Sequence, residues 1–264
     1  MNGFRLHTNN AVAMWEALAR GHGTVVMRTP RVSVIQPSLY HALRAIVLDP
    51  GQDQDLAVRE ITGTFLRPSS TARRIVEDAT GSLDLRSASF TPYLTMTVMV
   101  REPGALPQSP ARSETIGVVE VESPRALAVA ERVLTTVFPP ARSDSDWVGT
   151  DWAGQIQPVR VLDLPGWRVW LGCREGVPAC AAYTYDDGRS VGLYQVGTLA
   201  EHRGHGVARA LVEAILRAHP DVPASLTATD QGLPLYTRLG FQPVSRAVWW
   251  MPDPTGDDIG SVLR

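Results

Sequence analysis

The sequence predicts an α/β protein with a mixed central sheet flanked by helices, preceded by a smaller α+β domain. Three observations support this fold class. Apolar and polar residues alternate in short strand-like runs along the chain, and amphipathic repeats typical of helices lie between these runs. A Pro-rich polar segment at 101–114 separates two patterned regions. Strands that alternate with helices favour a sheet with helices packed on its faces.

The bulk composition excludes several classes of protein. The chain has 264 residues, of which 44% are apolar and 20% are charged, and this is ordinary for a water-soluble globular protein. The net charge of −2 gives no electrostatic reason to expect nucleic acid or an anionic membrane as a partner. No apolar run approaches the roughly 18 residues needed to span a bilayer, and the N-terminus lacks the apolar core of a signal peptide. We therefore expect a cytoplasmic protein.

We place a domain boundary near residue 112, within the Pro-rich segment. The predicted units are an N-terminal α+β domain at 1–112, a second domain at 113–252 and a polar tail at 253–264. The two cysteines, Cys173 and Cys180, flank a predicted turn and could approach each other across a hairpin. In a cytoplasmic protein we expect both to be reduced thiols. Two cysteines without clustered histidines give no metal-binding pattern.

The first domain is predicted to contain helices and strands in mixed order. A short helix at 11–21 ends at Gly21, and strands follow at 24–29 and 32–36. Helices are expected at 39–48, 55–66 and 69–81, the last capped by Ser69 or Ser70 and ended by Gly81. One or two strands at 87–101 complete the domain. It contains no recognisable catalytic cluster.

The second domain has a clearer order of elements. A strand at 115–123 precedes a helix at 124–138, for which Ser123 is the expected cap and Pro124 the first-turn residue. The other expected strands are a hairpin at 167–173 and 179–185, a strand at 191–199, a buried strand at 225–229 and a final strand pair at 241–251. Helices are expected at 206–219 and 232–240.

The loop RGHGVA, at 203–208, lies between a strand and the clearest amphipathic helix of the chain. Val207, Leu211 and Ile215 share the apolar face of this helix, whereas Arg209, Glu213 and Arg217 are spaced as a solvated face. The first turn of a helix has unpaired N–H groups and the positive end of the helix dipole. Glycines allow an anion to approach that backbone, and Arg203 adds charge, so a diphosphate would suit this loop.

Two motifs together resemble the GNAT superfamily of acyl-CoA-dependent N-acetyltransferases. Arg203, Gly206 and Ala208 match the family's [Q/R]-x-x-G-x-[G/A] loop. Thirty residues further on, the family's [LI]-Y-x-[KR]-x-G-F pattern is matched by Leu235, Tyr236, Arg238, Gly240 and Phe241. The resemblance covers about residues 113–252. It implies a GNAT fold, in which two parallel strands, here 191–199 and 225–229, splay apart to admit the acyl donor.

The resemblance implies acetyl-CoA as the acyl donor and an amine as the acceptor. The pantetheine arm would bind the backbone of Val196, Gly197 and Thr198. The diphosphate would bind the loop and the helix start, at Arg203, Gly204, His205, Gly206, Val207, Ala208 and Arg209. Thr229 stands where the family often has Asn, and its hydroxyl can still make one hydrogen bond. His202 and His205 are interpreted as solvated loop residues.

Tyr236 matches the family's usual general acid, which protonates the departing CoA thiolate. The general base is not evident, because the position at which some members carry Glu falls near Gly192. Tyr185, Tyr194, Asp151, Glu122 and a water relay remain alternatives. The tryptophans of this domain could wall an acceptor cleft or pack the core: Trp147, Trp152, Trp167, Trp170, Trp249 and Trp250.

The first domain resembles a degenerate GNAT half without the loop motif, so we predict no cofactor site in it. It could cover the acceptor cleft or donate a strand to the second sheet. The favoured function is N-acetyl transfer from acetyl-CoA to a primary amine of a small molecule or peptide. The alternatives are a non-catalytic acyl-CoA-binding protein with a GNAT fold, and the same fold acting with a longer acyl donor or an oxygen acceptor. No metal, membrane or nucleic acid is expected. The oligomeric state is open, with a homodimer as one option.

Overall fold

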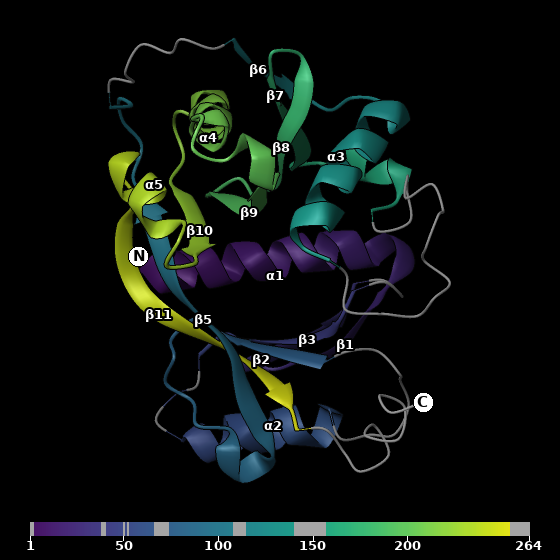
Figure 1. Ribbon diagram of the computed structural model, residues 1–264. Helices are drawn as coiled ribbons and strands as arrows, with labels where there is room; N and C mark the ends of the chain where they lie inside the picture. The colour runs from purple at the N-terminus through teal and green to yellow at the C-terminus, as the bar shows by residue number, and fades with distance from the viewer. Residues whose placement is uncertain are drawn as a thin grey trace, which may run out of the picture.

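One continuous sheet organises the computed structural model, which describes residues 3–37, 41–49, 51, 53–65, 74–107, 115–139 and 157–253. In these ranges eleven strands follow the order β1-β2-β3-β4-β11-β5-β10-β9-β8-β7-β6. Figure 1 shows the long strands β5 and β11 curving through the middle of the molecule. No helix in the described ranges is long and apolar enough to cross a membrane. The mixed sheet with helices on its faces agrees with the fold class expected from the sequence.

The described elements fall into two halves, which we call the N-terminal half (residues 3–107) and the C-terminal half (residues 115–253). The N-terminal half contains α1 (Gly3–His22), β1 (Thr24–Arg28), β2 (Val32–Gln36), β3 (Leu43–Val47), α2 (Gln54–Phe65), β4 (Arg74–Asp78) and β5 (Phe90–Arg101). The C-terminal half contains β6 (Ile116–Glu120), α3 (Pro124–Val137), β7 (Trp167–Arg174), β8 (Val177–Asp186), β9 (Val191–Thr198), α4 (Val207–Ala218), β10 (Ala224–Ala228), α5 (Leu233–Arg238) and β11 (Gln242–Pro252).

The two halves exchange their last strands. Strand β5 of the N-terminal half lies between β10 and β11 and is antiparallel to both. Strand β11 of the C-terminal half pairs with β5 along one edge and, at Val248–Trp250, with β4 along the other. Of the two roles expected for the first domain, donation of a strand to the second sheet is therefore confirmed. The predicted boundary near residue 112 lies in the segment 108–114, which is outside the described residues. Of the predicted tail at 253–264, all but Asp253 also lies outside them.

Helices cover both faces of the sheet. Helices α1 and α3 pack on one face, where Trp15 and Leu18 of α1 join Leu127 and Leu134 of α3 in one apolar cluster. Helices α4 and α5 cover the other face of the C-terminal half, and α2 covers that face of the N-terminal half. Helix α1 contacts strands of both halves, so it ties them together (Figure 1).

Two helices predicted in the first domain are wrong. The segment predicted as a helix at 39–48 contains β3, and the segment predicted at 69–81 contains β4. All five residues of β3 are buried, because α1 covers one face of the strand and α2 the other. A strand covered on both faces lacks the alternation of apolar and polar residues, and β3 is apolar at every position but Arg44. Periodicity alone does not distinguish such a run from a buried helix. Ser69 and Ser70, the predicted caps, lie outside the described residues.

Other boundaries differ less from the prediction. Helix α1 begins at Gly3, eight residues before the predicted start, and the predicted final strand pair is the single strand β11. The start of α3 is confirmed, because Ser123 Oγ accepts a hydrogen bond from the Ala126 N–H at 3.3 Å and Pro124 lies in the first turn. Cys173 and Cys180 are both free thiols, as expected.

The polar face expected for α4 is only partly solvated. Val207, Leu211 and Ile215 are buried as predicted. Glu213 is buried as well, with a 2% exposed fraction, and its two carboxylate oxygens pair with Arg209 Nε at 2.8 Å and Arg217 Nη2 at 3.4 Å. The three residues share one face at i, i+4 spacing as expected, but Glu213 on that face is buried and not solvated.

Candidate active site

The parallel strands β9 and β10 form a fork. They pair only at Val191 with Ala224 and at Gly192 with Ser225. Beyond these pairs β9 runs on to Thr198 and β10 to Ala228 with no further pairing between them. Their outer edges stay bonded to β8 and β5, respectively. The facing edges therefore present backbone N–H and C=O groups that a bound molecule can pair with.

A bulge turns β9 away from β10. The register between β8 and β9 shifts between Ala181 and Tyr183, opposite Gln195. Gln195 is exposed and has a φ of 51°, in the left-handed region that few side chains favour. Gly197 follows, where a Cβ atom would lie 2.9 Å from the Phe138 ring at the end of α3. The absence of a side chain at 197 lets α3 pack closely on this part of β9.

The loop after β9 leads directly to an open helix end. A 3₁₀ turn at Ala200–His202 precedes Gly204 and Gly206, which both have a φ of 80°. Gly206 is the N-cap of α4, and no side chain caps this helix. Arg203 folds back to donate from Nε to the Thr198 carbonyl at 3.1 Å. The first N–H groups of α4 are thus available to an anion, as the loop sequence suggested.

Tyr236 of α5 lies near the buried thiol of Cys180 on β8. The Tyr236 side chain is 7% exposed and its ring packs edge-on against Phe241, with 5.7 Å between centroids. Burial raises the pKa of Tyr236 above its usual range, and the nearby Cys180 thiol adds to this rise. Burial also raises the pKa of Cys180 to about 11, against the effect of a hydrogen bond with Thr198. Both groups therefore keep their protons at neutral pH.

Comparison with known proteins agrees with this geometry. Residues 165–243, which contain β7 to α5, match the family model described as Acetyltransferase (GNAT) domain. This segment belongs to the GNAT superfamily. The match supports acyl transfer as the class of reaction. Comparison with curated protein sequences gives no match.

Solved structures show that the same fold extends over both halves. A GCN5-related N-acetyltransferase from Kribbella flavida has a TM-score of 0.63 and 22% identity, covering 96% of this chain and 98% of that chain. A putative acetyltransferase of the GNAT family from Novosphingobium aromaticivorans has a TM-score of 0.56 and 14% identity, covering 87% and 92%. A third, a GCN5-related N-acetyltransferase from Sphaerobacter thermophilus, has a TM-score of 0.57 and 17% identity, covering 84% and 76%.

Within the GNAT segment, the residues predicted to bind the donor lie around the fork. Val196, Gly197 and Thr198 form the far end of β9, and the residues from Arg203 to Arg209 form the loop and the start of α4. Thr229 directly follows β10, and its Oγ1 accepts a hydrogen bond from the Gly232 N–H at 3.3 Å. Arg209 pairs with Glu213, which balances part of its charge. His205 is exposed as expected, whereas His202 is half-buried.

None of the side chains proposed as general base provides a carboxylate at the fork in the described part of the chain. Asp151 lies outside the described residues. Glu122 is exposed beside the start of α3, and Tyr185 is buried against Trp167. Tyr194 lies on β9, but burial raises its pKa well above the usual range, so it remains a phenol at neutral pH. Its partner is Asn10 of α1, a residue that the sequence patterns did not single out.

Two roles were expected for the tryptophans, to wall an acceptor cleft or to pack the core. Most of the described ones pack the core. Trp167, Trp170 and Trp250 are buried and Trp249 is half-buried, while Trp147 and Trp152 lie outside the described residues. Among the residues that the structure describes, no cluster of His, Cys, Asp or Glu could hold a metal ion.

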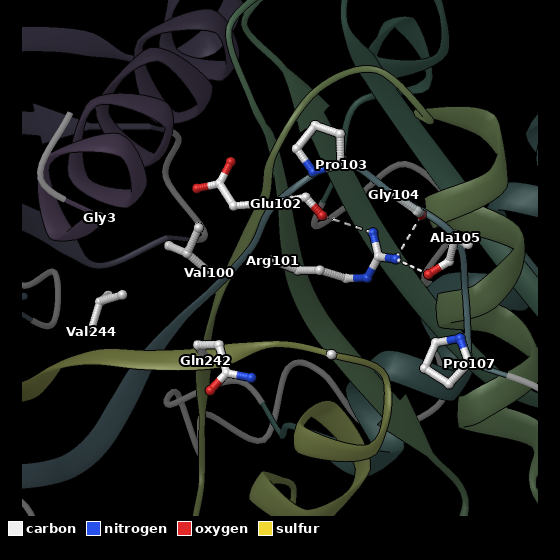
Figure 2. Close-up of a pocket in the computed structure, with 11 residues that line it drawn as sticks. Gly3, Val100, Arg101, Glu102, Pro103, Gly104, Ala105, Pro107, Gln242 and Val244 are labelled. Carbon is white, nitrogen blue, oxygen red and sulfur yellow. Dashed lines mark hydrogen bonds between the residues drawn. The ribbon is translucent and has the colours of Figure 1, made fainter.

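A surface hollow of about 450 Å³ lies away from the fork, between the start of α1 and the junction of β5 with β11 (Figure 2). Its Arg101 guanidinium is held by the carbonyl oxygens of Leu239, Glu102, Gly104 and Ala105. This cation is already paired with the backbone and has a structural role. A hollow of about 280 Å³ lies nearer the fork, where Leu199 and Pro178 meet α3.

Proposed function

We propose that this chain is an acetyl-CoA-dependent N-acetyltransferase that transfers the acetyl group directly to a primary amine of a small molecule or peptide. One observation carries the proposal: the fork between β9 and β10 opens beside the uncapped N-terminus of α4. An open strand edge suits the amides of a pantetheine arm, and an open helix end suits a diphosphate. The two features lie one short loop apart, between Thr198 and Val207.

The proposed reaction needs one proton donor at the leaving group. The neutral amine attacks the thioester carbonyl, a C–N bond forms and the C–S bond breaks. Tyr236 gives its proton to the departing CoA thiolate. The nitrogen of the new amide loses a proton to water, and the Tyr236 phenolate then takes a proton back from the solvent. Burial raises the pKa of Tyr236, which keeps the phenol protonated before this step but also makes it a weaker acid towards the thiolate.

Donor binding is tested first, by thermal unfolding with acetyl-CoA, CoA or ATP. A ligand that binds only the folded state stabilises it by about 2.7 kcal/mol at a hundredfold excess over Kd. We expect Gly204→Glu to abolish the acetyl-CoA shift, because it places a carboxylate at the proposed diphosphate site. Gly176→Glu is the matched control: both glycines have a φ of 80° and no atom within 4 Å of the place that a Cβ would take, but Gly176 lies in the β7–β8 turn. Equal shifts in both variants would contradict the proposed donor site.

The alternative is a non-catalytic acyl-CoA-binding protein, and the lack of a carboxylate base at Gly192 favours that alternative. Measurement of turnover separates it from the proposed enzyme. Release of free thiol from acetyl-CoA in the presence of an amine would exclude the binding protein. Loss of a general acid lowers the rate by about 10²-fold or more, so we expect Tyr236→Phe to lower kcat by about that factor. The acetyl-CoA thermal shift should persist in this variant. An unchanged kcat would remove Tyr236 from the proposed mechanism.

A further inference from the structure

Asn10 of α1 reaches from the N-terminal half into the base of the fork. Its side chain is fully buried, and its amide nitrogen donates to the carbonyl oxygens of Tyr185 at 3.1 Å and Ser190 at 2.9 Å. Its Oδ1 accepts a hydrogen bond from the Tyr194 hydroxyl at 2.6 Å. Both ends of the amide are thus committed, and the side chain has one fixed orientation.

The pair formed by Asn10 and Tyr194 occupies the space of a side chain at position 192. A Cβ atom on Gly192 would lie 2.1 Å from Asn10 Oδ1 and 2.4 Å from the Tyr194 hydroxyl oxygen. Real Cβ atoms do not approach other atoms so closely, so a side chain at 192 and this pair exclude each other. Glycine at the last paired position of β9 is therefore required by a polar pair that comes partly from the other half.

Tyr194 is placed on the side of the sheet from which an acceptor can approach. It lies two residues beyond the last β9–β10 pair and packs with the α1 and α3 cluster. Its neighbour Leu193 points to the opposite face, into the cluster with α4. The diphosphate end of the donor would lie at α4, which leaves the α1 face for the acceptor. Tyr194 as a residue is half-buried, whereas its partner Asn10 is fully buried.

The hydrogen bond between Asn10 and Tyr194 leaves the Tyr194 hydroxyl one way to interact with a ligand. The Tyr194 proton is donated to Asn10, so the phenol oxygen can act towards a ligand only as an acceptor. The carboxylate of Glu77 on β4 is also near enough to disfavour a phenolate. A neutral, fixed hydrogen-bond acceptor suits the N–H group of an amine.

We propose that Tyr194 binds the acceptor amine by accepting a hydrogen bond from its N–H, and that Asn10 of the N-terminal half is the positioning residue that orients Tyr194. This inference rests on the proposed acetyl transfer. The acceptor site would then be formed by both halves, because Asn10 on α1 of the N-terminal half orients Tyr194 of the C-terminal half.

Steady-state kinetics of Tyr194→Phe test the proposal. The acceptor is whichever of benzylamine, spermidine and triglycine gives the highest turnover with the wild-type chain. Loss of one hydrogen bond of about 1.4 kcal/mol corresponds to a tenfold change, so we expect the acceptor KM to rise about tenfold. The KM and the thermal shift for acetyl-CoA should stay unchanged. Asn10→Ala should also raise the acceptor KM, and the double variant should be no worse than the more impaired single variant, because both changes remove one unit.

Tyr183→Phe is the matched control, since Tyr183 lies directly opposite Tyr194 in the β8–β9 register and is buried. We expect it to change the melting temperature without changing the acceptor KM. If the wild-type chain turns over and Tyr194→Phe has the same acceptor KM, this inference is overturned while the proposed function stands. If Asn10→Ala fails to fold, Gly192→Ala provides a second way to separate the pair, and an unaltered acceptor KM there has the same meaning. No turnover by the wild-type chain with any of the three amines overturns the proposed function, and this inference with it.

Discussion

The two halves each contain a parallel strand pair joined through a helix, but only one pair opens. In the C-terminal half, β9 and β10 separate after two residue pairs. In the N-terminal half, β3 and β4 remain paired at four positions, from Leu43 with Arg74 to Ile46 with Glu77. The closed pair leaves no free strand edge for a pantetheine arm. The order strand–helix–strand is thus insufficient for a donor site, and the point at which the strands part decides whether one can form.

The N-termini of the helices that follow these strands differ as well: that of α4 is open to an anion and that of α2 is not. Helix α4 starts at Gly206 without a side-chain cap, whereas Asp53 Oδ1 accepts a hydrogen bond from the Leu56 N–H at 3.2 Å at the start of α2. Asp55 adds a second carboxylate in the first turn of α2. The end of α2 is therefore capped by the chain's own anion, and another anion would be repelled there. The N-terminal half thus lacks, in its described residues, the two features that form the proposed donor site, and the absence of a cofactor site there stays a prediction.

The largest expected effect concerns the ion pair that joins the closed strands. Arg44 of β3 pairs with Glu77 of β4, both side chains are nearly buried, and the guanidinium stacks 4.2 Å from the centre of the Trp15 ring. Arg44→Ala leaves a buried carboxylate unpaired, so we expect a loss of about 3–5 kcal/mol in the free energy of unfolding, measured with urea. Arg168→Ala breaks an exposed pair with Glu120 and should cost at most about 1 kcal/mol. Similar losses in the two variants would contradict the role given to Arg44.

The second effect is a pH dependence that arises beside the fork. Burial lowers the pKa of His7 to about 4, where its Nδ1 lies 3.4 Å from Ser225 Oγ. The unfolded chain binds a proton at this imidazole below about pH 6.5, whereas the folded chain does not until about pH 4. Stability should therefore fall as the pH falls from 6.5 to 4, by up to about 3 kcal/mol from His7.

Urea unfolding at several pH values measures this effect, and His7→Gln should flatten the profile between pH 4 and 6.5. His41 of the N-terminal half, buried against Trp15, has its pKa lowered to about 3 by burial and by Arg44. Burial also lowers the pKa of His219, so these two histidines should supply the remaining slope. His205→Gln, at an exposed loop position, serves as the control. A profile for His7→Gln that matches the wild type would show that His7 is not the group responsible.

The smallest effect tests whether the helix cap alone separates the halves. Loss of an N-cap typically costs about 1 kcal/mol, so Asp53→Ala should destabilise the chain by about that amount. It should not create a second acetyl-CoA site, because β3 and β4 stay paired. Equilibrium dialysis gives the stoichiometry, with one site per chain expected for wild type and variant. Two sites in Asp53→Ala would mean that the cap, and not the strand pairing, closes the N-terminal half.

The C-terminal half could be predicted largely from sequence because its signals are local. Helix α4 has its apolar face at regular spacing, and the two motifs that contain Arg203 and Tyr236 lie within one 39-residue stretch, 203–241. In the N-terminal half, burial of β3 on both faces removes the alternation that marks a strand. In β4 the half-buried residues Arg74 and Glu77 lie three positions apart, which is a helical spacing and not the alternation of a strand. The Asn10–Tyr194 bond joins residues 184 positions apart, and no local pattern contains such a contact. The burial of Glu213 between two arginines was also hidden from spacing alone.

The exchanged strands have a consequence for the order in which the chain can assemble. Strand β4 has one partner, β3, until β11 is present, and β11 is the last strand of the described chain. During synthesis the N-terminal half therefore emerges with an unpaired sheet edge, the kind of edge at which chains aggregate. Pairing between strands as far apart in the sequence as β4 and β11 also makes folding slow. The first half of the molecule is completed only when the last residues of β11 have left the ribosome.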